Sequence, residues 1–149
     1  MERIAVKRLT NSDLTFFDSI FKRSTSGNQK AINLNANIFT GRFYPDLADR
    51  AATSSIELPV DVTVYGPNSS PSYHFKRSIT KKTDTYKNWR LNGAAVPDPT
   101  NQPGRFDDLV DGDVAVMEFS GAPDPYGVRM ALGHKLINGF TNLANTDSF

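Results

Sequence analysis

The most distinctive chemistry of this chain lies in one basic stretch, Tyr73–Gly93, with the sequence YHFKRSITKKTDTYKNWRLNG. It contains six of the seventeen Lys and Arg residues against one acid, Asp84, so its local charge is +5 in a chain of net charge +1. Aromatic and amide side chains stand between the bases. Contact with a polyanion requires such positive charge together with hydrogen-bonding side chains. The stretch therefore predicts a nucleic-acid contact arm.

The remaining charge is distributed unevenly along the chain. Residues 1–30 carry +3, residues 31–72 carry −2 and residues 94–149 carry −5. Two basic segments separated by acidic ones give a polarised surface if the fold brings them together. The alternative is a set of solvated charges scattered around the surface. Charge alone supports the two interpretations equally.

Catalytic motifs are poorly represented. The two histidines, His74 and His134, are far apart, no cysteine is present, and neither a GxSxG elbow nor a P-loop occurs. A metal-dependent nuclease needs two carboxylates and a nearby lysine, and the segments after Glu57 and Glu118 lack that lysine. We therefore expect no active site, no cofactor and no metal in this chain.

One acidic cluster is a candidate cation site. It consists of Asp107, Asp108, Asp111 and Asp113. A charged turn before a strand is the interpretation that we favour. The alternative, a small metal-dependent hydrolase using Asp107–Asp113, would be established by magnesium-dependent hydrolysis that is lost in Asp111→Ala or Asp113→Ala.

Composition indicates a single globular domain over residues 1–149. The hydrophobic content of 38% and the charged content of 22% are ordinary, and the length suffices to bury a core without staples. No apolar run approaches the ~20 residues that a membrane helix needs. The N-terminus lacks the apolar core of a signal peptide, and zero cysteines fit a reducing cytoplasm. We expect a cytoplasmic protein without membrane contact, in which the aperiodic residues 138–149 would begin a linker.

The spacing of apolar residues predicts the elements that carry these side chains. Alternation predicts strands at Arg3–Arg8, Val60–Tyr65, Tyr73–Thr80, Val114–Phe119 and Val128–Leu132. Phe17, Ile20 and Phe21 stand at helical spacing, which predicts a short helix through Phe21 that is capped by Asn11 or Ser12.

A second short helix is predicted over Ala36–Phe43, capped by Asn35 and stopped by Pro45. Many short strands, regular turns and two small helices favour a mostly-β barrel or sandwich over a βαβ fold.

Several motifs resemble the plant B3 DNA-binding domain. Lys7–Asp13 resembles the K-x-L-T-x-S-D opening of that family, His74–Arg77 its W-x-F-R strand, and Leu109–Phe119 its L-x-x-G-D-V-V-x-F segment. A nearer similarity is to the effector domain of EcoRII-type restriction endonucleases. There a K-R-L-S opening, a G-x-Q loop and an F-P helix end recur, with a basic Trp-containing arm that leads to a Pro-rich turn like Ala94–Asn101. The resemblance covers roughly residues 4–120.

The resemblance implies a mainly β, seven-stranded open pseudobarrel with two short helices that grips duplex DNA with two arms in the major groove. Mapped by motif, the N-arm is Lys22–Lys30 and the C-arm is Lys81–Asn92, which are segments that the charge distribution also singles out. The implied function is a sequence-specific double-stranded DNA-binding module of a prokaryotic restriction endonuclease. Cleavage would come from a fused nuclease domain or a partner subunit.

Side-chain chemistry divides the arm residues into two groups. Arg, Lys, Asn and Gln read base edges in the major groove, and seven residues are assigned that role: Asn28, Gln29, Lys30, Lys87, Asn88, Arg90 and Asn92. Basic and hydroxyl side chains serve phosphates, and thirteen residues are assigned to the DNA backbone: Lys7, Lys22, Arg23, Ser24, Thr25, Ser26, Lys76, Arg77, Lys81, Lys82, Thr83, Thr85 and Tyr86. Trp89 is interpreted as a structural anchor of the C-arm, with contact to a sugar or a base methyl as the alternative.

Two further alternatives concern what the domain binds. A reader of methylated or hydroxymethylated cytosine, in a modification-dependent restriction system, needs an aromatic-lined pocket for a flipped base, and the sixteen aromatic residues could supply one. The other alternative is a protein-interaction barrel. Selection from random duplexes, with and without methylated cytosine, would distinguish these possibilities.

Overall fold

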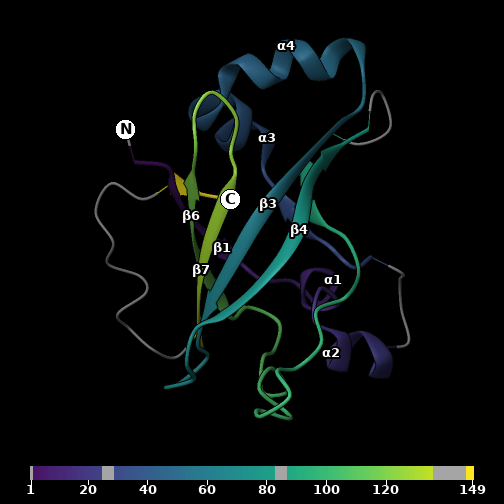
Figure 1. Cartoon of the computed structure of the whole chain (residues 1–149), viewed down its shortest axis with the longest axis vertical. Coiled ribbons are helices and arrows are strands. Elements are labelled where there is room, and N and C mark those ends of the chain that lie inside the picture. The colour runs from purple at the N-terminus through teal and green to yellow at the C-terminus, as the bar shows by residue number, and fades with distance from the viewer. Residues whose placement is uncertain (1, 25–28, 83–86, 136–146) are drawn as a thin grey trace.

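The computed structural model describes residues 2–24, 29–82, 87–135 and 147–149. The strands are β1 (Ile4–Arg8), β2 (Ile32–Leu34), β3 (Ile56–Tyr65), β4 (Tyr73–Lys81), β5 (Trp89–Asn92), β6 (Val114–Ser120), β7 (Gly127–Gly133) and β8 (Asp147–Ser148). The helical segments are α1 (Asn11–Leu14), α2 (Asp18–Arg23), α3 (Ala36–Ile38), the π-helical turn η1 (Phe39–Phe43) and α4 (Pro45–Thr53). Figure 1 shows that α3 and α4 lie towards one end of the sheet and α1 and α2 towards the other.

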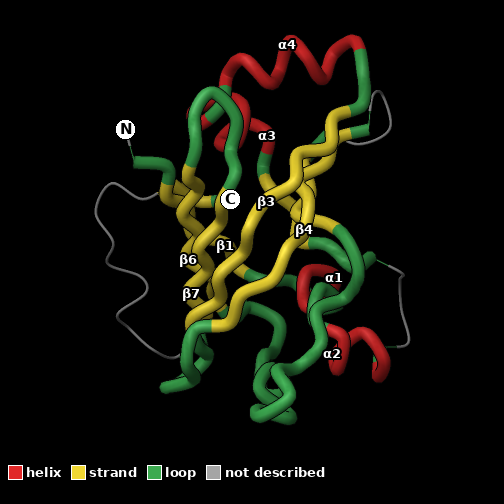
Figure 2. The backbone as a smooth tube through the Cα atoms, in the orientation of Figure 1, coloured by secondary structure: helices red, strands yellow, loops and turns green. Residues whose placement is uncertain are grey.

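All eight strands belong to one mixed sheet, in the order β2-β5-β4-β3-β7-β6-β1-β8. The sheet is open and curls into a half-barrel, with short helices at its ends (Figure 2). The predicted mainly β, open-barrel class is confirmed at this level. The element counts were wrong, because the described residues form eight strands and five helical segments instead of seven and two. No described helix has the length and apolarity needed to cross a bilayer.

Phe39 shows how the sheet closes around its core. Its ring centroid lies 5.2 Å from that of Trp89 on β5 and 5.4 Å from that of Phe119 on β6. These two strands are not neighbours in the sheet, since β4, β3 and β7 lie between them. One ring can contact both only because the sheet curls around it. The core therefore fills the inner face, and strand residues of the opposite alternation point outward.

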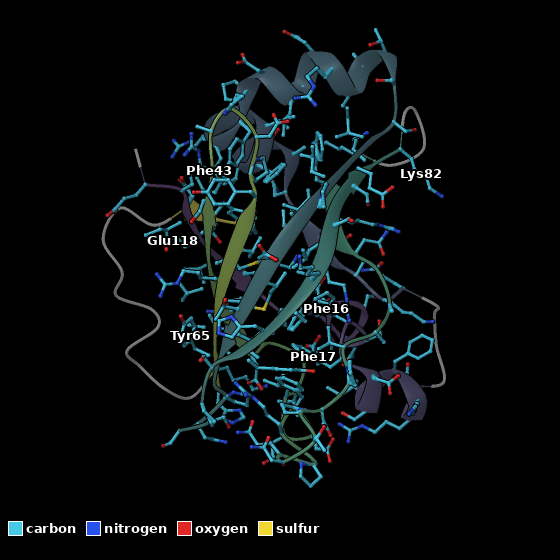
Figure 3. The ribbon with its side chains drawn as sticks, viewed as in Figure 1. Phe16, Phe17, Phe43, Tyr65, Lys82 and Glu118 are labelled. Atoms are coloured by element: carbon cyan, nitrogen blue, oxygen red, sulfur yellow. The ribbon has the colours of Figure 1, made fainter. Side chains whose placement is uncertain are left out.

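The predicted helix through Phe21 is interrupted between α1 and α2. Phe16 and Phe17 occupy the break and are fully buried (Figure 3). The backbone at the break pairs with Val96: the Val96 N–H donates to the Phe16 carbonyl and the Asp18 N–H donates to the Val96 carbonyl, both at 2.8 Å. With the backbone paired to Val96, both rings enter the core.

The second predicted helix, Ala36–Phe43, is correct in its cap and its bounds, but it continues from α3 into the π-helical η1, and a further helix follows it. Asn35 caps α3, since its side chain accepts a hydrogen bond from the Asn37 N–H at 2.8 Å. Pro45 begins another helix, α4, instead of ending the region. Proline is favoured in the first turn of a helix, where its missing N–H has no intrahelical partner to lose. Leu47 is buried and attaches α4 to the core.

The C-terminal residues return to the sheet. β8 pairs in parallel with β1, and the Phe149 N–H donates to the Val6 carbonyl at 2.8 Å. The Phe149 ring packs against Phe43 and Phe119. Residues 138–149 were expected to begin a linker. Of these, residues 147–149 belong to the folded domain, and residues 138–146 lie outside the described part of the chain.

Candidate nucleic-acid interface

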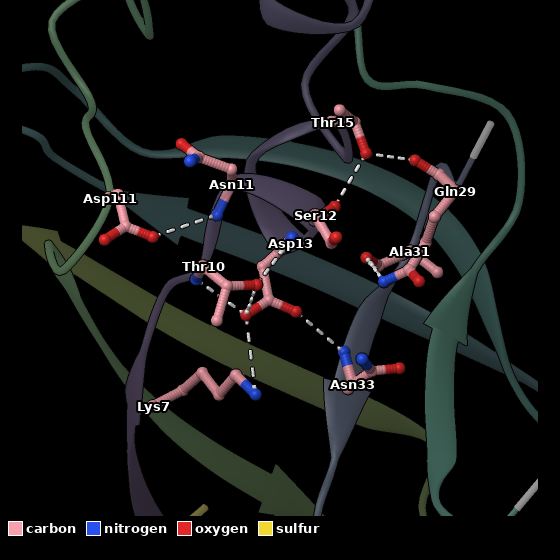
Figure 4. Close-up of polar contacts among 10 residues, drawn as sticks. All are labelled: Lys7, Thr10, Asn11, Ser12, Asp13, Thr15, Gln29, Ala31, Asn33 and Asp111. Carbon is pink, nitrogen blue, oxygen red and sulfur yellow. Dashed lines mark hydrogen bonds and ion pairs between the residues drawn. The ribbon is translucent and has the colours of Figure 1, made fainter. Parts of the chain in front are cut away.

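Asp13 is a buried hub between β1, α1 and β2. Its carboxylate accepts hydrogen bonds from the Thr10 N–H at 2.9 Å, the Thr10 hydroxyl at 3.1 Å and the Asn33 N–H at 3.1 Å (Figure 4). Thr10 in turn accepts from the Asp13 N–H, which completes a capping box. Thr10 is therefore the cap of α1, and the prediction that one of the two following residues caps it is wrong.

Lys7 completes this hub. Its ammonium lies 3.4 Å from Asp13 Oδ2, and its side chain is 12% exposed. A lysine that compensates a buried carboxylate stabilises the fold and is not available to a phosphate. This placement gives Lys7 a structural role and does not favour its assignment to the DNA backbone.

Asp113 forms a second buried hub. Its carboxylate accepts hydrogen bonds from the N–H groups of Val110 (2.8 Å) and Lys135 (3.0 Å), and His134 Nδ1 lies 3.2 Å away. Burial by itself raises the pKa of Asp113, but these hydrogen bonds and the charge of His134 outweigh it and lower the pKa below its ordinary value. Asp111 separately accepts from the Asn11 N–H at 3.2 Å. Among the described residues, no three His, Asp or Glu side chains gather as a metal site would require.

Two basic residues of the N-arm, Lys22 and Arg23, lie on α2, and each contacts a polar group of the protein. The Lys22 ammonium lies 2.8 Å from Asp18, one helical turn earlier, and this exposed pair raises the pKa of Lys22. Arg23 Nη2 donates to the Asp107 carbonyl at 2.9 Å. Both side chains are on the surface, where such contacts exchange readily with a phosphate. Ser24 ends α2.

Gln29 and Lys30 lead from the N-arm into β2. The Gln29 side-chain amide donates to the Ala31 carbonyl at 2.8 Å, and the Thr15 hydroxyl donates to the Gln29 carbonyl. The Lys30 ammonium lies 4.6 Å from the centre of the Phe21 ring. Six assigned residues lie outside the described part of the chain: Thr25, Ser26, Asn28, Thr83, Thr85 and Tyr86.

The C-arm is shorter than predicted, because its last four residues form β5. This strand pairs with β4 on one side and β2 on the other. Trp89 and Leu91 are buried, so Arg90 and Asn92 point to the outer face of the sheet. Arg90 and Asn92 are therefore strand residues on the outer face of the sheet, at the C-terminal end of the predicted C-arm.

Arg90 stands in a polar row across four neighbouring strands. In the sheet register it lies opposite Asn33 of β2 and Thr80 of β4, and Thr80 lies opposite Glu57 of β3. Beside this row is a hollow of about 70 Å³, lined by Thr80, Lys81, Lys82, Asn88, Arg90 and Asn92. Five of these six residues are ones that sequence reasoning assigned to DNA. Figure 3 shows Lys82 projecting away from the sheet at this end.

Thr80 and Asn33 are members of this face that sequence reasoning missed. Thr80 was identifiable, because it alternates with the buried Ile79 in a strand that was correctly predicted. Asn33 was not, since only the pairing of β2 with β5 brings it beside Arg90.

Lys76 and Arg77 differ although they are adjacent on β4. The Lys76 side chain is 88% exposed, on the outer face, with its ammonium 3.8 Å from Asp61. Arg77 Nε donates to the Ala94 carbonyl at 2.7 Å, and the guanidinium lies 5.0 Å from the centre of the Phe75 ring. Burial lowers the pKa of Arg77. Arg77 thus fixes the loop after β5, which does not favour its assignment to a phosphate.

Trp89 lies in the core. The residue is 1% exposed, and its ring packs against Phe39. This position suits a structural anchor at the start of β5, and it leaves almost no ring surface for a base or a sugar.

The two polar segments meet the sheet at opposite ends of the same strand pair. Antiparallel pairing sets Ile32 opposite Leu91 and Leu34 opposite Trp89. Lys30, just before β2, is therefore near the C-terminal end of β5, whereas Lys87 precedes its N-terminal end. The outer face of β2, β5 and β4 lies between them.

Comparison of the chain with known protein families, with curated proteins and with solved structures found no match. The motifs quoted above are therefore the basis of the resemblance to B3 domains.

Proposed function

We propose that this protein binds double-stranded DNA with a preference for sequence, through the outer face of β2, β5 and β4 and the two polar segments that flank it. We further propose that the curled sheet is a B3-like pseudobarrel. In this assignment the chain is the recognition module of a prokaryotic restriction endonuclease, and a fused domain or a partner subunit supplies the nuclease.

The observation that carries the proposal is the placement of Lys30 and Lys87 at opposite ends of one strand pair. The four residues of β5 span roughly 13 Å at ~3.3 Å per residue. The major groove of B-DNA is about 12 Å wide. Two polar segments separated by this length can enter one groove from its two sides, while the sheet face between them meets the phosphates.

The charge of this face supports the same assignment. Lys81, Lys82 and Arg90 line its hollow, and none of the described residues in its lining is acidic. Among the described residues, neither Lys82 nor Lys87 forms an ion pair with an acid within 4 Å. Cations without a protein partner can release the counterions of DNA without first breaking an ion pair.

Selection from a random duplex library at physiological salt tests the proposal. We expect enrichment of one short motif, and a parallel library with methylated cytosine shows whether modification changes it. None of the described residues that line the hollow is aromatic, so we expect the unmodified motif to be bound at least as well as the methylated one. Equal binding to all duplexes would contradict sequence-dependent recognition.

A further inference from the structure

The hollow on the outer face of β4 and β5 is small. Its volume is about 70 Å³. Pockets for drug-sized organic ligands measure about 300–1,000 Å³. The hollow therefore suits a compact group such as a tetrahedral oxyanion.

Hydrogen bonding within the protein leaves the Thr80 hydroxyl as a donor. Asn92 Nδ2 donates to Thr80 Oγ1 at 3.3 Å, and Asn92 Oδ1 accepts from the Gly93 N–H at 2.8 Å. Both polar ends of the Asn92 amide are thus engaged. Because Thr80 Oγ1 already accepts a hydrogen bond, its own proton remains for a ligand that accepts.

The Asn88 side chain, like the Thr80 hydroxyl, has hydrogen-bond donors that the protein does not use. Its Oδ1 accepts from the Ala36 N–H at 3.2 Å, which identifies the other end of the amide as the nitrogen. The two N–H groups of this nitrogen add donors to a hollow that Arg90 also lines. Amide and guanidinium donors beside a hydroxyl donor form a surface that accepts anions and disfavours cations.

The surrounding charge is positive. Lys81 and Lys82 line the hollow, and the Lys81 ammonium donates to the Lys82 carbonyl at 3.2 Å. The nearest acid in the register is Glu57, opposite Thr80 on β3, and its exposed side chain is not part of the lining.

We infer that this hollow is an oxyanion site that holds one phosphate group. The inference rests on the proposed function, in which that group is a single phosphate of the DNA backbone. It reassigns Asn88 and Arg90 from reading bases to holding the backbone, and it reassigns Asn92 to orienting Thr80. Base readout then falls to the flanking segments.

Arg90→Ala and Asn88→Asp test the site, with Arg129→Ala as the control. Arg129 is an exposed arginine on β7 of the same sheet. Asn88→Asp keeps the acceptor for the Ala36 N–H and replaces the donor with a carboxylate oxygen. We expect each test variant to lose about tenfold or more in affinity for selected and random duplexes alike, and Arg90→Ala to lower the salt slope by about 0.9.

The variants also separate a phosphate contact from a base contact. Arg90→Lys keeps the charge, so we expect the salt slope to persist while affinity falls less than in Arg90→Ala. Loss confined to the selected duplex, with preference relaxed at one base pair, would overturn the inference. Equal loss in Arg129→Ala would also overturn it, because the effect would then be one of net charge.

Two further measurements identify the source of the phosphate. In a duplex with one neutral methylphosphonate at a time, we expect a single position that weakens the wild-type protein and leaves Arg90→Ala unchanged. The absence of such a position contradicts a backbone phosphate in the hollow. If no duplex binds at all, the proposed function fails. A titration with inorganic phosphate, followed by the amide NMR signals of Thr80 and Asn88, then decides the site: saturable shifts that Arg90→Ala abolishes support it, and unchanged signals reject it.

Discussion

Asp13 and Asp113 are buried carboxylates, and each is satisfied by groups from more than one part of the chain. Asp13 joins Lys7, Thr10 and Asn33, and Asp113 joins the turn before β6 to the end of β7. Both residues belong to motifs that carry the resemblance to B3 domains. At the residue scale, these two motif residues therefore stabilise the fold by joining separate parts of the chain.

Removal of the Asp13 carboxylate should destabilise the protein strongly. Asp13→Ala leaves Lys7 partly buried without its partner and leaves the Asn33 N–H without an acceptor, so we expect a loss of about 3–5 kcal/mol in the free energy of unfolding. Asp18→Ala removes the surface ion pair with Lys22 and should change the free energy of unfolding by less than about 1 kcal/mol. Urea unfolding of both variants checks this. Equal effects would contradict the role of Asp13 as a hub.

Asp113 should make stability depend on pH in the acid range. Its folded pKa lies below its unfolded value, so its stabilising contribution is complete above the unfolded pKa of about 3.9 and is lost as pH falls through the folded pKa. We expect Asp113→Asn to be less stable at neutral pH and to show a smaller loss of stability on acidification. Urea unfolding between pH 7 and pH 3, with the exposed Asp108→Asn as control, measures this. An unchanged pH dependence in Asp113→Asn would show that Asp113 is not a source of the acid sensitivity of the fold.

At the element scale, local pattern predicted the long strands and failed where tertiary contacts decide. Alternation around Val62 predicted β3, because each apolar residue there faces the core. The break at Phe17 depends on pairing with Val96, almost eighty residues away, which no local pattern contains. β5 was missed because the charge of its neighbours led to the assignment of an arm. Its inner residues, Trp89 and Leu91, already alternated as a strand requires.

The placement of the single tryptophan gives a direct test of β5. Trp89 is buried against Phe39, so its fluorescence should be blue-shifted and resistant to quenching by acrylamide. Because the ring faces the core, we expect the emission to change little when duplex DNA binds. Strong quenching by DNA would indicate that the ring contacts a base or a sugar. Trp89→Phe should fold, and Trp89→Ala should lose about 3–5 kcal/mol of stability.

At the scale of the whole molecule, a net charge of +1 conceals a polarised surface. The sheet register gathers residues near 30, 80 and 90 on one outer face, whereas the acid-rich residues 107–113 lie in the turns before β6. The sequence could predict the two basic segments from their composition. It could not predict that they flank one strand pair, because this depends on which strands become neighbours.

The central claim is that duplex DNA binds to this face, and two triple variants of equal charge test it most directly. One replaces Lys81, Lys82 and Lys87 with Gln. The other replaces Arg8, Arg129 and Lys135, which are outside the proposed face, with Gln. Fluorescence anisotropy with the selected duplex, between 50 and 200 mM salt, gives the affinity and the salt slope of each.

Loss of the phosphate contacts of Lys81 and Lys82 should lower the salt slope of the first variant by roughly 1.8, and loss of Lys87 should weaken binding further. The second variant should keep the wild-type slope and an affinity close to that of the wild type. Equal losses in the two variants, or an unaffected first variant, would contradict the proposed interface.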